Sequence, residues 1–393
     1  MHQDHVSAWP GLKRTAIAGF VGVSWLAVAA GSAFAVQTDA PKAGTSRIKA
    51  DVVAKGLDSP WAMAFLDNGD VLITEKPGGM KIVRAGGAAI NVTGLPPIAD
   101  VGQGGLLDVV TAPDFAETSK IYFSYSEPRG GGRSAVAVSH AVLNRDGGSA
   151  RLENVTRIFQ QQPAVRSGYH FGSRIVFRPD GTMFVTLGDR GRRDQSQKTD
   201  RHWAKVVRIA QDGSVPDDNP FVGRNGVLPE IWSIGHRNVQ GADLHPETGQ
   251  LWTVEHGARG GDEINLPEAG KNYGWPVISY GRHYSGGKIG VGRKRAGLEQ
   301  PKYYWDPSIA PSGLTFYSGD LFPDWKGDVF VGALKYRLLV RLDLNDAGEI
   351  VGEERLLSDI GERIRHVRQG PDGALYVLTD SGNGKLLRIT PAG

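Results

Sequence analysis

The sequence predicts an all-β protein, specifically a six-bladed β-propeller of four-stranded antiparallel sheets. Three observations support this fold class. One strand–turn–strand plan recurs six times along the chain, sustained helical periodicity is almost absent, and 54 glycines are spread among the apolar runs. Short strands joined by tight turns need such glycines, and a repeated plan of this kind suits radially arranged antiparallel sheets better than a sandwich or a parallel sheet.

Each repeat has one apolar strand, a turn and a second apolar strand. The six pairs of strands are Trp61–Phe65 with Val71–Thr74, Leu106–Val110 with Ile121–Tyr125, Arg174–Phe177 with Met183–Thr186, Ala242–Leu244 with Leu251–Val254, Gly313–Tyr317 with Asp328–Val331, and Ile364–Val367 with Ala374–Leu378. Their turns carry Asp, Gly or Pro, as in Asp67-Asn68-Gly69 and Pro371-Asp372-Gly373. A spacing of about 60 residues exceeds that of common propeller repeats and predicts long loops on one face. Unrelated hairpins of a large all-β protein are the alternative.

The N-terminal segment has the order of a secretory signal peptide. Lys13 and Arg14 precede an apolar run from Ala16 to Ala30, and Ala33-Phe34-Ala35 is a small-x-small cleavage site. A membrane anchor is the alternative, but Gly and Ser interrupt the run, which is short for a membrane span. We therefore expect residues 1–35 to be removed and residues 36–393 to form a single propeller domain. The mature protein is then periplasmic or secreted, without a membrane span.

The composition excludes several classes of function. The chain has no cysteine, so disulfides, thiolate catalysis, Cys-x-x-Cys-His haem attachment and zinc–cysteine sites are ruled out, and a large core must hold the fold together. A net charge of +3 without a lysine-rich block gives little support for nucleic-acid binding. Gly102-Gln103-Gly104-Gly105-Leu106 resembles a nucleotide loop but opens a strand rather than a helix, which argues against nicotinamide cofactors.

Several loops carry more chemistry than a turn requires. His170 lies between glycines and beside aromatic residues just before the third repeat, and a histidine there can act as an acid or base near neutral pH. A purely structural histidine is the alternative. Arg237 and Asn238 precede the fourth repeat and offer donors for a planar, oxygenated anion. The segment 255–265 combines acidic residues with glycine-rich backbone, whose oxygens suit calcium, although a solvated acidic turn would look the same.

Cationic side chains follow or open strands of the last two repeats. Lys335 ends a strand of the fifth repeat, and Arg363 and Arg365 open the sixth. Strand alternation places both arginines on one side, where they repel each other unless an anion lies between them. An anionic ligand or a carboxylate of the protein would serve equally well.

Seven segments, in order, resemble the soluble quinoprotein glucose and aldose sugar dehydrogenases, which depend on pyrroloquinoline quinone (PQQ). The resemblance runs from about Gly56 to Ile389. The segments are Gly102–Leu106, Gly168–His170, Gly235–Asn238, Asp262–Asn265 followed by Asn272–Pro276, Trp305–Ser312, Leu334-Lys335 and Arg363–Arg365. The resemblance implies an exported enzyme that oxidises the C1 hydroxyl of aldoses to lactones, with PQQ and Ca²⁺ as cofactors. It also implies a small-molecule sugar substrate, an external electron acceptor, and a monomer or homodimer.

The resemblance also implies roles for particular residues. His170 matches the general base that takes the C1 hydroxyl proton, and Arg237 matches a residue that stabilises charge on the cofactor. Gln103 matches a residue near both cofactor and substrate, while Tyr169 and Trp305 are expected beside the sugar. Tyr169 stands where glucose-specialised members have an acidic residue, so we expect His170 to lack that neighbouring carboxylate.

The remaining matches concern the cofactor and the metal. The expected PQQ contacts, besides Gln103 and Arg237, are Asn238, Lys335, Arg363 and Arg365. The backbone carbonyls of Gly257 and Ala258 match the ligands of the calcium that also binds PQQ, and alanine at 258 replaces a familiar proline. Glu263 and Tyr273 match part of a second, structural calcium site. Three other functions stay open: oxidation of sorbosone or another polyol or aldehyde, a non-catalytic ligand-binding or partner-binding propeller, and a calcium-dependent lactonase.

Overall fold

The computed structural model describes residues 45–392, which belong to one compact unit spanning Val36–Gly393. The predicted signal peptide lies outside the described residues. Within them, helical structure is confined to α1 (Phe115–Thr118) and three single-turn 3₁₀ helices, η2 (Arg193–Gln195), η3 (Pro323–Trp325) and η4 (Ser358–Ile360). None of the helices between residues 45 and 392 is long and apolar enough to cross a membrane.

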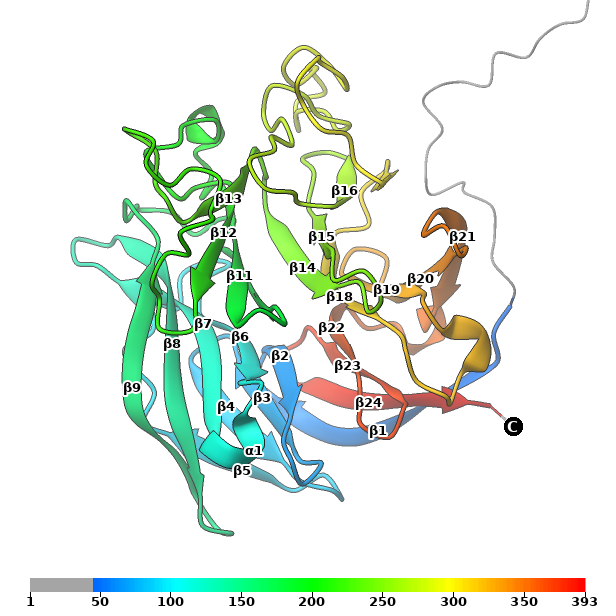
Figure 1. Cartoon of the computed structure of the whole chain (residues 1–393). Helices are drawn as coiled ribbons and strands as arrows, with labels where there is room; N and C mark the ends of the chain where they lie inside the picture. Colours follow the sequence, from blue (N-terminus) through cyan, green and yellow to red (C-terminus); the bar gives the residue numbers. More distant parts are fainter. Residues whose placement is uncertain (1–44, 393) are drawn as a thin grey trace, which may run out of the picture. The chain divides into compact units, whose positions relative to one another are not determined.

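The strands form six four-stranded antiparallel sheets, which Figure 1 shows radiating from a common centre. Four are separate sheets, and two are joined edge to edge by a short parallel pairing of β5 with β9. From the centre outward, the first three sheets are β2 (Pro60–Phe65), β3 (Val71–Glu75), β4 (Gly79–Val83) and β5 (Ala89–Thr93); β6 (Leu106–Thr111), β7 (Lys120–Pro128), β8 (Ser134–Arg145) and β9 (Ala150–Gln160); and β10 (Gly172–Phe177), β11 (Thr182–Leu187), β12 (Lys205–Ala210) and β13 (Ile231–Ile234). The other three are β14 (Val239–Leu244), β15 (Leu251–Glu255), β16 (Asp262–Asn265) and β17 (Tyr303–Trp305); β18 (Pro311–Phe316), β19 (Val329–Ala333), β20 (Leu338–Leu344) and β21 (Ile350–Leu356); and β22 (Ile364–Gln369), β23 (Leu375–Thr379), β24 (Gly384–Pro391) and β1 (Ile48–Leu57).

The innermost strands close into a ring. β2 contacts β6, β6 contacts β10, and the contacts continue through β14, β18 and β22 back to β2. This ring of six blades confirms the predicted six-bladed β-propeller. The six predicted strand pairs correspond to the two innermost strands of each blade, from β2 and β3 to β22 and β23.

Buried polar side chains join neighbouring blades at the level of the innermost strands. Asp108 Oδ2 accepts a hydrogen bond from the Ile175 backbone N–H at 2.8 Å. His366 Nδ1 accepts one from the Met63 N–H at 3.1 Å, which links the last blade to the first. Burial lowers the pKa of His366 well below its usual range, so the ring is neutral and Nδ1 is free to accept. These bonds join the innermost strands of neighbouring blades near the middle of each strand. The innermost strands all run in the same direction.

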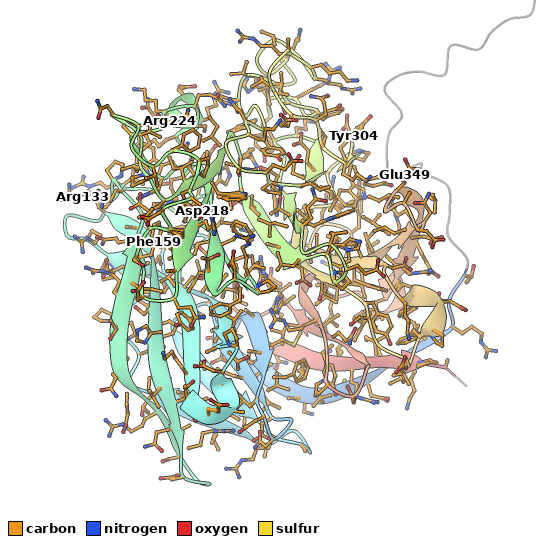
Figure 2. All side chains as sticks on the ribbon, viewed as in Figure 1. Arg133, Phe159, Asp218, Arg224, Tyr304 and Glu349 are labelled. Carbon is orange, nitrogen blue, oxygen red and sulfur yellow. The ribbon has the colours of Figure 1, made fainter. Side chains whose placement is uncertain are left out.

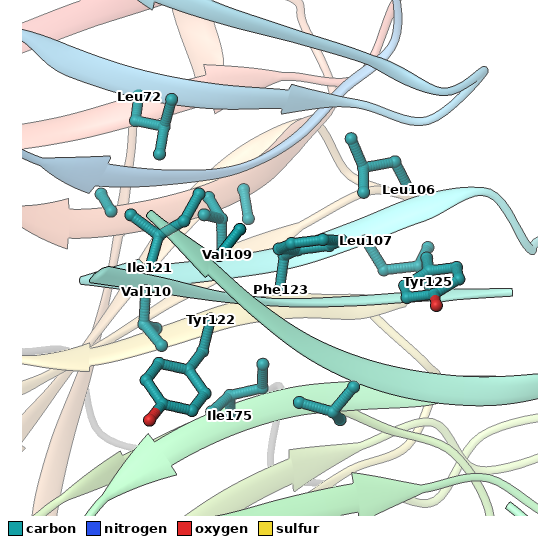
Figure 3. Close-up of a cluster of buried hydrophobic side chains, with 14 of the residues drawn as sticks. Leu72, Leu106, Leu107, Val109, Val110, Ile121, Tyr122, Phe123, Tyr125 and Ile175 are labelled. Atoms are coloured by element: carbon teal, nitrogen blue, oxygen red, sulfur yellow. The ribbon is translucent and has the colours of Figure 1, made fainter. Parts of the chain in front are cut away.

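Most of the core lies between adjacent blades. Figure 3 shows Leu72 of the first blade, Val109 and Phe123 of the second and Ile175 of the third in one buried cluster. Figure 2 shows side chains filling the spaces between the sheets around the ring. A fully buried large apolar side chain contributes about 1.5–3 kcal/mol relative to an exposed one, so these layers replace the disulfides that the chain lacks.

The last blade is completed by the first strand. β1 pairs antiparallel with β24, with Ile48 opposite Pro391 and Leu57 opposite Gly384.

Because the innermost strands all run the same way, the loops that precede them lie at one end of the ring, which we call the mouth end. The turns that follow them lie at the opposite end, the base end.

Candidate active site

His170 lies at the mouth end, immediately before β10, and its backbone has a positive φ of 49°. A non-glycine residue in this region is strained, and such strain persists where the surroundings fix it. The His170 N–H donates to Gln103 Oε1 at 2.8 Å, and its Nδ1 lies 2.6 Å from Asp189 Oδ1. The side chain is 15% exposed, and Nε2 has no partner among residues 45–392. The free nitrogen is the one available to a ligand.

Asp189 is the buried partner of this histidine. Its carboxylate also accepts hydrogen bonds from Trp275 Nε1 at 2.8 Å and from the Gly191 N–H at 2.7 Å. Burial alone would raise the pKa of Asp189, but the hydrogen bond and charge of His170, with Arg237 nearby, hold it below its usual value. His170 therefore has an ionised carboxylate beside it that comes from a different loop, although the preceding residue, Tyr169, supplies none.

Arg190 fixes the backbone that carries His170. It is fully buried, and its guanidinium donates to the carbonyls of Tyr169 at 3.1 Å and Ser167 at 2.9 Å. The same group lies 3.7 Å from the centre of the Phe171 ring. The loop is held on both sides, by this cation and by Gln103.

Arg237 occupies the next position around the mouth end. Its Nη1 donates to the carbonyl of His256 at 3.0 Å and also to that of Gly257, and the Asp189 N–H donates to its carbonyl at 2.9 Å. Its Nε is buried and has no hydrogen-bond partner among the described residues. A buried donor without a partner is costly, so this side chain is set to bind a group that the protein does not supply.

Arg363 and Arg365 are connected to the loop of Arg237 and Asn238 through side-chain hydrogen bonds. Asn238 Oδ1 accepts from Gln240 Nε2 at 3.3 Å, and Gln240 Oε1 accepts from Arg365 at 3.4 Å. Asp380 lies between the two arginines, 2.9 Å from Arg363 Nε and 3.2 Å from Arg365 Nη2. A carboxylate of the protein therefore separates the arginines, one of the two alternatives that the sequence left open.

Lys335 is a cation of the site without a carboxylate partner among the described residues. It is exposed in the turn between β19 and β20, and no carboxylate within the described chain pairs with it. Leu334, its neighbour, accepts a bond from Arg363 through its carbonyl at 3.4 Å. With Arg237, Arg363 and Arg365, this lysine gives the mouth end an excess of positive charge over Asp380.

The glycine-rich segment after β15 contributes backbone oxygens. The Gly257 N–H donates to Asp262 Oδ1 at 2.9 Å, and its carbonyl faces the Arg237 guanidinium. Asp262 also accepts from the Ile309 N–H at 2.8 Å, so it ties the 257–258 segment to the next blade. Ala258 forms a single bridge with Gly260 and is partly exposed. The guanidinium contacts fall on the carbonyls of His256 and Gly257, and carbonyl oxygens are ligands that calcium prefers.

Glu263 and Tyr273 lie behind this segment, around a cavity of about 10 Å³ that Glu255 also lines. Asn265 donates to both carboxylates, at 2.9 Å for Glu255 and 3.1 Å for Glu263. Burial, and then the neighbouring Glu255 carboxylate, raise the pKa of Glu263 well above its usual range. Tyr273 stacks on His236 with ring centres 4.8 Å apart. Two close carboxylates beside a cavity of one-atom size need a proton or a cation between them.

Trp305 is not where a sugar-binding residue would be. It is fully buried in β17, pairs with Asp262 across the sheet, and donates from Nε1 to Glu353 at 2.9 Å. No face of its ring is available to a ligand in this structure, so the expected contact with the sugar is not supported. Tyr169, in contrast, is 62% exposed beside His170, with ring centres 6.1 Å apart.

Three residues of the site escaped the sequence analysis in these roles: Asp189, Asp380 and Trp275. The first two share a signal that could have found them. Asp189 comes two residues after β11 and Asp380 directly after β23, and both strands are the second of their blade. Second strands end at the mouth end, as β19 does before Lys335. A charged residue just after each second strand is therefore a candidate for the site.

No group of three or more histidine, aspartate or glutamate side chains arranged to hold a metal occurs within residues 45–392. The metal ligands expected at Gly257 and Ala258 are backbone oxygens, which such a group would not include.

Fold and site together define a six-bladed propeller whose mouth end joins a histidine–aspartate pair to an excess of cationic side chains. The model of the Glucose / Sorbosone dehydrogenase family matches residues 57–388. The aldose sugar dehydrogenase YliI of Escherichia coli is 45% identical over 354 residues, which cover 89% of this chain and 94% of that protein. The chain belongs to the glucose/sorbosone dehydrogenase family.

Solved structures of relatives agree in fold. The apo form of the soluble aldose sugar dehydrogenase from Escherichia coli superposes with a TM-score of 0.85 at 44% identity, over 88% of this chain and 100% of that one. The PQQ-bound aldose sugar dehydrogenase from Streptomyces coelicolor has a TM-score of 0.73 at 25% identity, over 88% and 99% of the two chains.

Proposed function

We propose that this protein is a PQQ-dependent aldose sugar dehydrogenase that oxidises the C1 hydroxyl of its substrate to a lactone. The observation that carries the proposal is the His170–Asp189 pair, which leaves one imidazole nitrogen free and has Arg237 near its carboxylate. The PQQ-bound structure of a relative supports the choice of cofactor.

The residues present fit an anionic, oxygen-rich cofactor. The unpartnered Arg237 Nε and the exposed Lys335 offer donors that the described chain does not satisfy. With Gln103, Asn238, Arg363 and Arg365, they would hold PQQ, whose three carboxylates suit such donors. When bound, PQQ supplies the carbon that accepts the hydride from C1 of the sugar.

His170 performs the proton transfer. The ionised Asp189 accepts from Nδ1–H, which fixes the tautomer in which Nε2 is the base. Nε2 takes the C1 hydroxyl proton, and Asp189 stabilises the imidazolium that forms. Arg237, with a free Nε, would stabilise the negative charge that builds up on the cofactor when it accepts the hydride. Tyr169 is exposed beside the base and is the residue placed to contact the sugar.

Gly257 and Ala258 would hold the calcium ion through their carbonyls, and Arg237, which now donates to the Gly257 carbonyl, lies beside them. A cation there acts as a Lewis acid on the oxygen it binds. Asp262 keeps the segment in place from behind, through its bonds to the Gly257 and Ile309 backbone.

Reconstitution tests the proposed function. The purified apo-protein, given PQQ and Ca²⁺, is expected to reduce an artificial electron-accepting dye in the presence of an aldose, because the residues expected to contact PQQ all come from the mouth end. Aldoses, sorbosone and other polyols are compared in the same assay. Protein without PQQ is the control. Absence of PQQ-dependent dye reduction with every sugar would reject the proposal in favour of a binding propeller.

Calcium is expected to stabilise the protein more strongly as the pH rises. Without metal, the raised pKa of Glu263 means that the folded state holds a proton that the unfolded state has lost, so stability falls as pH rises above the ordinary glutamate pKa of 4.5. A calcium ion between Glu255 and Glu263 replaces that proton and removes the penalty. The Tm difference between calcium and a chelator, measured from acid to mildly alkaline pH, tests this.

Glu263→Gln is the matched variant for that measurement. Its amide carries no charge, so the pH-dependent part of the calcium effect should disappear while the variant stays folded. A Tm difference that is independent of pH in the wild-type protein would place no cation at this pair.

A further inference from the structure

The two ends of the ring carry opposite charge. The base-end turns, taken as residues 66–70, 84–88, 112–119, 146–149, 178–181, 211–219, 245–250, 317–328, 345–349 and 370–374, contain 16 Asp and Glu and three Lys and Arg. Four mouth-end segments, residues 188–204, 256–261, 269–298 and 334–337, contain 14 Lys and Arg and three Asp. We call these four segments the basic face. Between Glu268 and Glu299, 30 consecutive residues include six Lys and Arg and no acid.

Hydrogen bonds place the long segment 269–298, which follows β16 in Figure 1, among the mouth-end loops. Arg193 Nη1 lies 2.9 Å from His283 Nδ1, which joins the segment to the 188–204 loop. The backbones of Arg259 and Arg282 exchange hydrogen bonds of 2.9 and 3.0 Å, which join it to the 256–261 loop. The Trp275 N–H donates to the Gly235 carbonyl at 2.9 Å. Three of the four segments of the basic face, residues 188–204, 256–261 and 269–298, are thus one continuous set of loops.

The charges of this face are open to solvent. Arg192, Arg282, Lys288, Lys294 and Arg295 are all exposed, and none forms an ion pair within the part of the chain that is described. The catalytic proposal uses none of these five side chains. A structural role would pair them with carboxylates, so their accumulation on one face points to an external anion.

Charges separated in this way steer an incoming molecule. A positive face beside the site attracts anions, while the acidic base end repels them, and such fields raise association rates by about 10- to 10³-fold at low ionic strength. Electrostatic complementarity acts mainly on the association rate, which suits partners that bind briefly and leave.

We propose that the basic face is the docking surface for an acidic one-electron redox protein that reoxidises the reduced enzyme. This inference rests on the proposed function. Oxidation of one aldose to its lactone removes two electrons and two protons. Two molecules of the oxidised partner each take one electron in turn, and the two protons pass to solvent.

A transient protein partner fits this face better than a membrane surface. The mouth end must be open for each sugar to enter, so whatever covers it has to leave within each catalytic cycle. Redox partners form small, short-lived and charge-guided complexes, whereas attachment to an anionic lipid surface through many cations persists and would cover the mouth end.

The test compares two forms of one acceptor. Native cytochrome c is basic, and succinylation of its lysines gives an acidic protein with the same haem. The holoenzyme, reduced by its sugar, is expected to reduce the succinylated form at least about tenfold faster than the native form at low ionic strength, and salt should reduce this preference by screening. Equal rates for the two forms at low ionic strength would overturn the proposal.

Charge-reversal variants locate the surface. Lys288→Glu/Arg295→Glu on the basic face should slow reduction of the succinylated form about tenfold, through loss of steering. The matched control, Arg84→Glu/Lys326→Glu at the base end, changes the net charge equally and should leave the rate within about twofold, because the charges lie far from the docking face. Equal effects of the two pairs would contradict a local docking surface.

Two further measurements separate this proposal from the proposed function. Reduction of the bound cofactor by sugar without any acceptor should be unchanged in both variants; its absence in the wild-type enzyme would refute the dehydrogenase function. Binding of oxidised succinylated cytochrome c to immobilised enzyme, without sugar, should weaken only in the mouth-end variant. Sedimentation with phosphatidylglycerol vesicles at physiological ionic strength, lost in that variant, would show a lipid-binding face and overturn the proposal.

Discussion

Replacement of His170 by alanine is expected to lower kcat for aldose oxidation by about 10²–10⁴-fold, the usual contribution of a general base. Among the described partners of the Asp189 carboxylate, which are His170, Trp275 Nε1 and the Gly191 N–H, His170 is the group that can take the C1 hydroxyl proton, and alanine removes it. The backbone N–H that donates to Gln103 is retained, so the loop should keep its position. Steady-state rates with saturating PQQ and Ca²⁺ measure the effect.

The cofactor affinity of the same variant provides its control. Because the donors expected to hold PQQ lie on other loops, PQQ titration should give an unchanged Kd for His170→Ala. Tyr169→Phe, one residue away, keeps the aromatic ring and should alter KM for the sugar rather than kcat. Turnover by His170→Ala at the wild-type rate would show that His170 is not the base.

Replacement of Asp189 by asparagine is expected to lower kcat by about 10²-fold or more, since a carboxylate behind a catalytic histidine fixes its tautomer and stabilises the imidazolium. The asparagine amide can donate to Nδ1, which would place the remaining proton on Nε2 and block it as a base. Its oxygen can still accept from Trp275, so the fold should survive. Single-turnover reduction of the bound cofactor by sugar isolates this step.

Asp380→Asn is the matched control for that variant. Asp380 is another mouth-end carboxylate, and it pairs with Arg363 and Arg365 rather than with a histidine. Its loss leaves proton transfer intact and releases two arginines, so it should change the affinity for PQQ and leave the single-turnover rate nearly unaltered. If both variants slow that step equally, the role of Asp189 is not specific to His170.

The inner half of each blade could be predicted from the sequence, and the outer half could not. β2, β3, β6, β10 and β11 are buried on both faces between neighbouring blades, so they read as continuous apolar runs. Outer strands such as β9 alternate between buried and exposed residues, with many polar side chains, and leave a weaker signal.

For the site, the sequence predicted individual residues in short motifs but not the contacts between residues of different loops. His170, Gln103, Arg237 and Lys335 belong to short motifs that can be recognised along the chain. The pairing of His170 with Asp189, and of two arginines with Asp380, depends on loops brought together only by the closed blades. Trp305 shows what a motif leaves out, because the motif identifies the residue without showing that β17 buries it.

The pairing of β1 with β24 sets the order in which the molecule can form. Five blades are continuous in the chain, but the sixth needs strands from both ends of the described segment. During synthesis, β1 emerges early and has no partner until β24 follows, more than 300 residues later. Such a long-range contact forms late and at a high entropic cost. The ring can therefore close only after the last strand, β24, is available to pair with β1, and we expect the mouth-end loops to take their final positions at that step.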